Sequence, residues 1–383
     1  MSTQHAQSAN CFSRSRRANR RASLYAFLAV GALALSALLI DIAPSWAGGP
    51  QPVAAATPAA DTAKNNTVLG IGFDGRQVSD LDKSIQFYEA LGFAVEGKPT
   101  DWKVDKDFNK LGGTDGAKSR SARMTIQSSV STTPFILILT EYKGIDRKNW
   151  GTLATSDLLS GHIDLTIQDD IAPVAAKLQA INMFRPVSMG IGGGGPMHTF
   201  GFVQDPDGMF VEMIAKRAPT PGAPPPPQPA GEQVDRTGKY PGFNHIGLNV
   251  QDPKKALAFY QDILGGDYPP LPPDQPTPPG SRPRMNMLNG WFSQANTDGK
   301  MRLELLPFPQ TGGKTIPDER FSDIGVNYVG FEVTDIDAVY AQAQAAGAKT
   351  VSDGGVVKVK GGRAVIVRDP DVGGFVELFE PAK

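Results

Sequence analysis

Hydrophobic and polar residues alternate along two short stretches of the chain that match each other. The first reads GHIDLTIQDD at residues 161–170, and the second reads NHIGLNVQDP at residues 244–253. Alternation with a period of two is typical of a half-buried β-strand. We therefore expect two copies of one strand, with His162 and His245 at equivalent positions on the polar face.

The same order of elements recurs four times from Thr67 onward. In each copy a short strand ends near an aspartate, an amphipathic helix follows, and about three further strand-like runs close the unit. The aspartates occupy equivalent places, where a carboxylate can cap the first amides of a helix; they are Asp80, Asp169, Asp252 and Asp335. A repeat this regular predicts four βαβββ modules and an α+β fold.

Proline-rich stretches indicate where the chain divides. Residues 217–239 are predicted to be a linker between two domains, at residues 67–216 and 240–383. A second proline-rich insert at residues 268–284 interrupts the third module and predicts a surface loop. The second and fourth modules each close on an Asp-Pro-Asp sequence, which is typical of a tight turn.

The first 47 residues differ in composition from the rest. Five arginines precede an apolar run at residues 24–40, and the small residues Ser45 and Ala47 stand at the −3 and −1 positions of a cleavage site. This order is typical of an export signal, so residues 1–47 are predicted to be a signal peptide, or an N-terminal anchor if uncleaved. Residues 48–66 would be a flexible tether, and the body would be periplasmic or extracellular.

The composition of the body excludes several classes of function. Hydrophobic residues make up 40% and charged residues 20% of the chain, which is ordinary for a globular protein. Because the leader holds five arginines, the body is mildly acidic and has no electrostatic reason to bind nucleic acid. The single cysteine, Cys11, lies in the leader, which excludes thiol chemistry in the mature protein. We expect a monomer with an internal pseudo-dimer that binds a small-molecule substrate and touches the membrane only through an uncleaved leader.

Two motifs carry a resemblance to a known family. The pattern H-x-x-L-x-V-x-D opens the third module, and D-P-D-G-x-x-x-E closes the second. Together with the repeated modules they resemble the vicinal oxygen chelate (VOC) superfamily, which includes glyoxalase I, extradiol dioxygenases, fosfomycin-resistance enzymes and bleomycin-binding proteins. The resemblance covers residues 67–216 and 240–381. It implies two glyoxalase-like domains with cup-shaped mixed sheets, and up to two metal ligands on the first and last strands of each module.

Matching the modules to this pattern gives the candidate ligands. The first-strand positions are Phe73, His162, His245 and Tyr328, and the last-strand positions are Ile138, Glu212, Glu304 and Glu377. The resemblance therefore implies metal ligands in the second and third modules. The first module has neither ligand, while the fourth offers Tyr328 and Glu377 as secondary candidates. Two imidazoles and two carboxylates suit a divalent ion such as Zn, Ni, Co, Fe or Mn.

The pairing of the modules decides whether these ligands meet. If neighbouring modules share a sheet, the two histidines fall in different domains. If the modules are exchanged as in glyoxalase I, the second and third share one cup and form one complete site. We favour the exchanged arrangement because it gathers both histidines and both carboxylates.

The resemblance implies a metal-dependent lyase or isomerase that acts on two adjacent substrate oxygens through an enediolate, with Glu212 as the general base. His198, which starts the strand before Glu212, is a candidate proton shuttle or a structural histidine. Two alternatives stay open. An extradiol dioxygenase would need two histidines and one glutamate around Fe(II), and a non-enzymatic binding or resistance protein would hold an apolar or aromatic ligand without metal.

Overall fold

The structure is a computed structural model that divides the chain into two units, Met1–Ala60 and Asp61–Lys383. All described residues belong to the second unit; they are 67–150, 153–191, 198–216, 239–271, 287–307 and 318–383. The predicted leader, tether and linker, and most of the second proline-rich insert, lie outside the described residues. Within the described residues, no helix combines the length and the apolar character needed to span a membrane.

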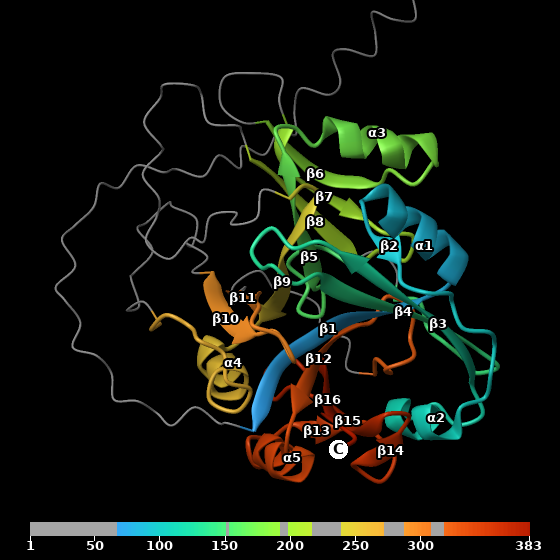
Figure 1. The fold of residues 1–383 in the computed structure, drawn as a ribbon, viewed down its shortest axis with the longest axis vertical. Coiled ribbons are helices and arrows are strands. Elements are labelled where there is room, and N and C mark those ends of the chain that lie inside the picture. Colours follow the sequence, from blue (N-terminus) through green and yellow to red (C-terminus); the bar gives the residue numbers. More distant parts are fainter. Residues whose placement is uncertain (1–66, 151–152, 192–197, 217–238, 272–286, 308–317) are drawn as a thin grey trace, which may run out of the picture. The chain divides into compact units, whose positions relative to one another are not determined.

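One sheet is built by the second and third modules (Figure 1), in the order β10-β11-β9-β5-β8-β7-β6. Its strands are β5 (His162–Gln168), β6 (Pro186–Ile191), β7 (His198–Gln204), β8 (Phe210–Lys216), β9 (Gly242–Val250), β10 (Leu288–Ser293) and β11 (Lys300–Pro307). The first strands, β5 and β9, pair antiparallel at the centre. Each also runs parallel to the last strand of its own module, β8 or β11.

The other sheet is built in the same way by the first and fourth modules, in the order β13-β15-β16-β12-β1-β4-β3-β2, with β14 on β15. Its strands are β1 (Val68–Val78), β2 (Ala94–Val95), β3 (Lys118–Ile126), β4 (Phe135–Lys143), β12 (Asn327–Val333), β13 (Lys349–Thr350), β14 (Val357–Val359), β15 (Gly362–Arg368) and β16 (Phe375–Pro381). The central pair is β1 with β12. The exchanged pairing of the modules is therefore confirmed.

The α+β fold class and the mixed sheets are also confirmed. Each module is a strand, a helix and further strands, although the third has only β10 and β11 after its helix in the described part of the chain. The ranges 67–216 and 240–383 each supply one module to each sheet, and their boundaries as domains stay a prediction.

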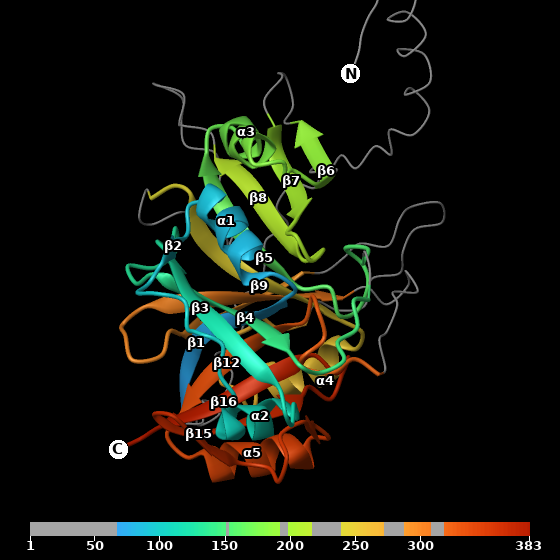
Figure 2. The ribbon, with the colours of Figure 1, turned by 90° about the vertical axis from the view of Figure 1, so that its right-hand side faces the viewer.

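The helices are α1 (Leu81–Ala90), α2 (Lys106–Gly112), α3 (Ala172–Ala180), α4 (Pro253–Tyr260) and α5 (Ile336–Ala345). α2 packs on β14 and β15 on the face that carries Phe73 and Tyr328, and the other helices cover the outer faces of the sheets. α1 packs on β3 and β4, and α5 packs on β15 and β16 (Figure 2). Because helices cover one face and the other face is also enclosed, β5 is buried on both faces rather than half-buried as predicted.

Three of the four predicted helix caps are present. The carboxylates of Asp80, Asp252 and Asp335 each accept a hydrogen bond from a backbone N–H in the first turn of their helix. The prediction for the second module is wrong. Asp169 has a positive φ of 61°, whereas an N-cap residue needs an extended backbone, and α3 begins later, after Ile171.

The Asp-Pro-Asp turns join modules that lie in different sheets. Asp207 accepts hydrogen bonds from the backbone N–H and the hydroxyl of Ser79. Asp371 likewise accepts from the backbone N–H groups of Gln251, at 2.7 Å, and Asp252, at 2.9 Å. Each turn therefore ties its module to the preceding module of the sequence, across the boundary between the sheets. The rings of Phe135 and Phe243 stack across the same boundary, with their centroids 3.7 Å apart.

Candidate metal centre

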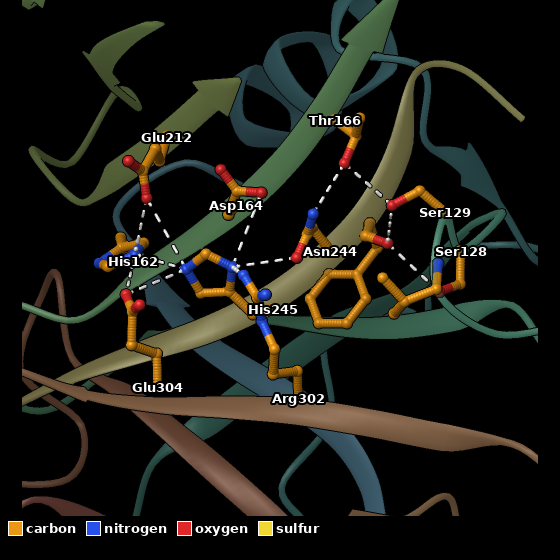
Figure 3. A network of polar contacts seen from close by, with 12 residues as sticks. Ser128, Ser129, His162, Asp164, Thr166, Glu212, Asn244, His245, Arg302 and Glu304 are labelled. Atoms are coloured by element: carbon orange, nitrogen blue, oxygen red, sulfur yellow. Dashed lines mark hydrogen bonds and ion pairs between the residues drawn. The ribbon is translucent and has the colours of Figure 1, made fainter. Parts of the chain in front are cut away.

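The four side chains predicted as ligands converge on one point of the sheet made by the second and third modules (Figure 3). His162 Nε2 lies 3.1 Å from Glu212 Oε2 and 3.2 Å from His245 Nε2. His245 Nε2 lies 3.2 Å from Glu304 Oε2. The two diagonal distances are longer, 3.7 Å from His245 Nε2 to Glu212 Oε2 and 3.9 Å from His162 Nε2 to Glu304 Oε2. All four residues are buried.

Strand register explains this convergence. His162 on β5 lies opposite Gly247 on β9, and His245 lies opposite Asp164. Glu212 lies beside Asp164, two residues along β5 from His162 and therefore on the same face. Gly247 provides the space for the imidazole, because a Cβ atom there would lie 1.9 Å from His162 Cε1. The repeat therefore places all four groups on one face.

The spacing of the donor atoms fits a divalent ion. A tetrahedral site with bonds of about 2.1 Å has donor atoms about 3.4 Å apart, and the distances above scatter around that value. His162, Glu212 and His245 form the most compact group, with their ligand atoms all within 4.8 Å of one another. Glu304 lies beside this group and completes a set of two nitrogen and two oxygen donors. Such a set suits Zn and other first-row divalent ions.

Burial sets the charge states of these groups. It lowers the pKa of His162 to about 4, which leaves a neutral imidazole, the form that binds metals. Burial raises the pKa of Glu212 to about 7. Burial also acts to raise the pKa of Glu304, but the neighbouring His245, His162 and Arg302 outweigh it and lower that pKa to about 2. The two carboxyl groups therefore differ, and Glu304 is the permanent anion.

Arg302 on β11 is a site residue that the sequence analysis missed. Its Nη2 lies 2.6 Å from His245 Nδ1. Because a guanidinium can only donate, this contact favours the tautomer with a bare Nδ1 and a proton on Nε2, next to Glu304. Coordination through Nε2 requires the other tautomer. Asn244 Oδ1, 3.2 Å from Nδ1, is an acceptor for the proton in that case. Arg302 precedes Glu304 by two positions, so the strand period was a signal that both share a face.

Asp164 is a second residue that was missed. Its Oδ1 lies 3.7 Å from His245 Nδ1, and burial raises its pKa to about 8, with His245 and Arg302 acting in the opposite direction. Neither carboxyl oxygen has a hydrogen-bond partner among the described residues. Each first-strand ring has one residue opposite it on the neighbouring strand. Opposite His245 this residue is Asp164, whereas the other three rings each face a glycine, at Gly247, Gly330 and Gly75.

The secondary candidates do not join this site. Tyr328 and Glu377 lie in the other sheet, where the rings of Phe73 and Phe321 pack against Tyr328 at 5.7 Å and 4.8 Å between centroids. Aromatic packing thus occupies the place where the first and fourth modules would hold ligands. His198 begins β7, and its side chain lies outside the described residues.

Glu377 gives a pH-dependent stability. Burial raises its pKa from 4.5 to about 8, so between these pH values the folded state binds a proton that the unfolded state has lost. Stability should therefore fall as the pH rises through this window, by up to about 1.4 kcal/mol per pH unit. In Glu377→Gln this contribution should be absent, and the variant should gain stability over the wild type with rising pH. Urea unfolding across the window measures it; parallel curves for the two proteins would contradict it.

Comparison with known sequences places part of the chain in a family. The sequence model of the Glyoxalase/Bleomycin resistance protein/Dioxygenase superfamily matches residues 242–374. These residues, which span the third module and most of the fourth, therefore belong to that superfamily. The resemblance to VOC proteins is thereby confirmed for this part of the chain. No curated protein matches the sequence.

Several solved structures are similar to this chain. A glyoxalase I mutant from Zea mays is 19% identical with a TM-score of 0.48, and the match covers 81% of this chain and 92% of that chain. A putative dioxygenase from Bacillus subtilis subsp. subtilis str. 168 is 13% identical with a TM-score of 0.44, covering 83% and 87%. An antibiotic binding protein from Streptomyces sp. is 23% identical with a TM-score of 0.22, covering 36% and 92%.

Proposed function

We propose that the protein is a metal-dependent enzyme of the glyoxalase type, a lyase or isomerase that acts on a substrate with two adjacent oxygens. The observation that carries this proposal is the meeting of His162, His245, Glu212 and Glu304 at one buried point, with donor atoms spaced as a divalent ion requires. The superfamily match of residues 242–374 supports the same class.

The four residues divide the work according to their charge states. A bound divalent ion would polarise the substrate oxygens as a Lewis acid. His162, His245 and Glu304 would hold the ion, because the buried His162 is a neutral imidazole and Glu304 is a carboxylate at neutral pH. Glu212 would accept a proton from the carbon next to a carbonyl group, since in the metal-free site burial raises its pKa to about 7 and makes it a stronger base than Glu304.

The place of action follows from the leader. The arginines and the apolar run of residues 1–47 support export, so the reaction would take place in the periplasm or outside the cell, on a protein that is either released or anchored to the inner membrane. A substrate found outside the cytoplasm is therefore part of the proposal.

A turnover screen tests the proposed reaction. Purified protein, stripped of metal and reloaded with Zn, Ni, Co, Fe or Mn in turn, is given thiol adducts of 2-oxoaldehydes, and isomerisation is followed by absorbance. Metal-dependent turnover supports the proposal. A fully loaded protein that turns over none of these adducts counts against a lyase or isomerase of this type.

Binding of the ion has its own prediction. A ligand that binds only the folded state at 100 times its dissociation constant stabilises it by about 2.7 kcal/mol, which corresponds to a rise of about 3–4 °C in Tm for a chain of this size. The rise should be absent in His162→Ala/His245→Ala. A matched control is Phe73→Ala/Tyr328→Ala, which changes the equivalent positions of the other sheet and should keep the metal-induced rise, whatever its own Tm. Equal metal content in the wild type and the histidine variant would contradict the site.

A second candidate function is an extradiol-type dioxygenase. The compact group of His162, Glu212 and His245 is a set of two histidines and one carboxylate, which suits non-haem Fe(II) oxygenases. Oxygen uptake by the Fe(II)-loaded protein in the presence of catechols would favour this function over the first.

A further inference from the structure

A buried arginine links the first two modules. Arg76 on β1 is fully buried, with its guanidinium enclosed by polar groups. Its Nη1 donates to Tyr88 Oη at 2.7 Å, and its Nη2 donates to the carbonyl oxygen of Phe210 at 3.2 Å. The same Nη1 lies 3.8 Å from Asp205 Oδ2, which in turn accepts a hydrogen bond from Tyr88 Oη at 2.9 Å. Arg76 Nε also lies 3.4 Å from Asp74 Oδ2, so the cation is held by a tyrosine, two carboxylates and a carbonyl group.

The third and fourth modules repeat this arrangement without the cation. Arg76 lies three residues after Phe73, and Leu248 lies three residues after His245, the counterpart of Phe73. Leucine therefore stands at the position of the arginine. Three of the groups that enclose Arg76 have counterparts: Tyr260 for Tyr88, Asp369 for Asp205, and Phe375 for Phe210. The fourth, Asp74, is replaced by Ile246.

These counterparts line a cavity of about 30 Å³, together with Asn249 and Asn327. One water molecule needs only about 10–15 Å³ of such space, so the cavity takes a group larger than a single water. The lining residues Leu248, Tyr260, Asp369 and Phe375 are the repeat counterparts of the residues of the Arg76 cluster. The cavity therefore lies where the repeat would place a guanidinium.

The cavity lining includes one carboxylate, that of Asp369. Burial raises the pKa of Asp369 to about 6, while the backbone N–H groups of Asp371, Val372 and Gly374, which donate to its carboxylate at 2.8, 3.0 and 2.6 Å, act to lower that pKa.

The carboxylate of Asp369 lacks the buried arginine that lies beside Asp205, because Leu248 stands at the position of Arg76. A ligand that is a cation and carries several N–H donors would take the place of that guanidinium beside Asp369.

We propose that the cavity beside Leu248 binds the guanidinium group of a small molecule, in the place that Arg76 fills in the other half of the protein. The site is separate from the candidate metal centre, because it involves none of its four ligands. The inference also does not depend on the proposed reaction.

The test is calorimetric titration of the full-length protein with methylguanidinium. We expect saturable binding, and none with methylurea, which has a similar shape but no charge. In Leu248→Arg the new side chain should fill the cavity and weaken binding by at least about tenfold, a change of 1.4 kcal/mol. Leu248→Met is the matched control and should bind as the wild type does. No saturable heat with the wild type, or unchanged affinity in a folded Leu248→Arg, would overturn the proposal.

Two further measurements locate the bound cation. Glu212→Gln/Glu304→Gln removes the two carboxylates of the metal centre, which could also attract methylguanidinium, and it should leave the affinity unchanged; a loss would assign the binding to the metal centre and overturn the proposal. A crystal structure with methylguanidinium should place it between Tyr260 and Asp369. This second measurement also decides the matter if Leu248→Arg does not fold, since density at any other place refutes the site.

Discussion

Replacing Glu212 by glutamine is expected to lower the turnover number by about 10²- to 10⁴-fold, the usual contribution of a general base. Glutamine keeps the shape and one oxygen of the side chain but cannot accept a proton near neutral pH. The other three ligand side chains stay in place, so the variant should still bind a divalent ion. Steady-state kinetics of the metal-loaded proteins, beside a measurement of bound metal, separates lost proton transfer from lost metal.

The repeat provides a control for this experiment. Glu377 holds the equivalent position in the other sheet, where it lies among aromatic side chains and not beside histidines. Glu377→Gln should therefore leave the turnover number unchanged. If the turnover number falls by the same factor in both variants, the loss comes from a disturbed fold and not from a missing general base. If Glu212→Gln keeps full activity, another group takes the proton.

Replacing Arg76 by methionine is expected to lower the free energy of unfolding by about 3–5 kcal/mol, the cost of removing one member of a buried ion pair. The change would leave the carboxylates of Asp74 and Asp205 buried without their cation. Because Arg76 also bonds to Tyr88 and to the carbonyl group of Phe210, the contact between the two sheets would weaken as well. Urea unfolding at neutral pH measures the loss.

Leu248→Met is the matched control, since Leu248 is the counterpart of Arg76 in the other half. A swap of leucine for methionine keeps the volume and the apolar character, and it should cost less than about 1.5 kcal/mol. Equal losses in the two variants would show that Arg76 acts by filling space rather than by its charge.

The sequence predicts well which four side chains come together, because the repeat supplies redundant information. Two histidines at one repeat position and glutamates at another are improbable without a shared role, and the period of a strand places each on a known face. The same repeat predicts the exchanged pairing, since only that arrangement gathers both histidines. The fold class follows from the same modules.

Contacts across strands and between sheets could not be predicted in this way. The distance from Arg302 to His245 depends on the register between β11 and β9, and that register is set by packing rather than by the local pattern. The Arg76 cluster joins residues more than a hundred positions apart. The wrong cap at Asp169 has a local cause, because its positive φ is not encoded in the aspartate that it shares with the other modules.

The exchange of modules also affects how the chain matures. Each central seam joins strands from opposite halves of the sequence, β1 with β12 and β5 with β9. While the ribosome is still adding the second half, β1 and β5 lack partners along these edges, and open strand edges recruit strands of other chains. The fold therefore leaves the nascent first half prone to aggregation until the last module emerges, and protection during synthesis becomes a requirement of this architecture.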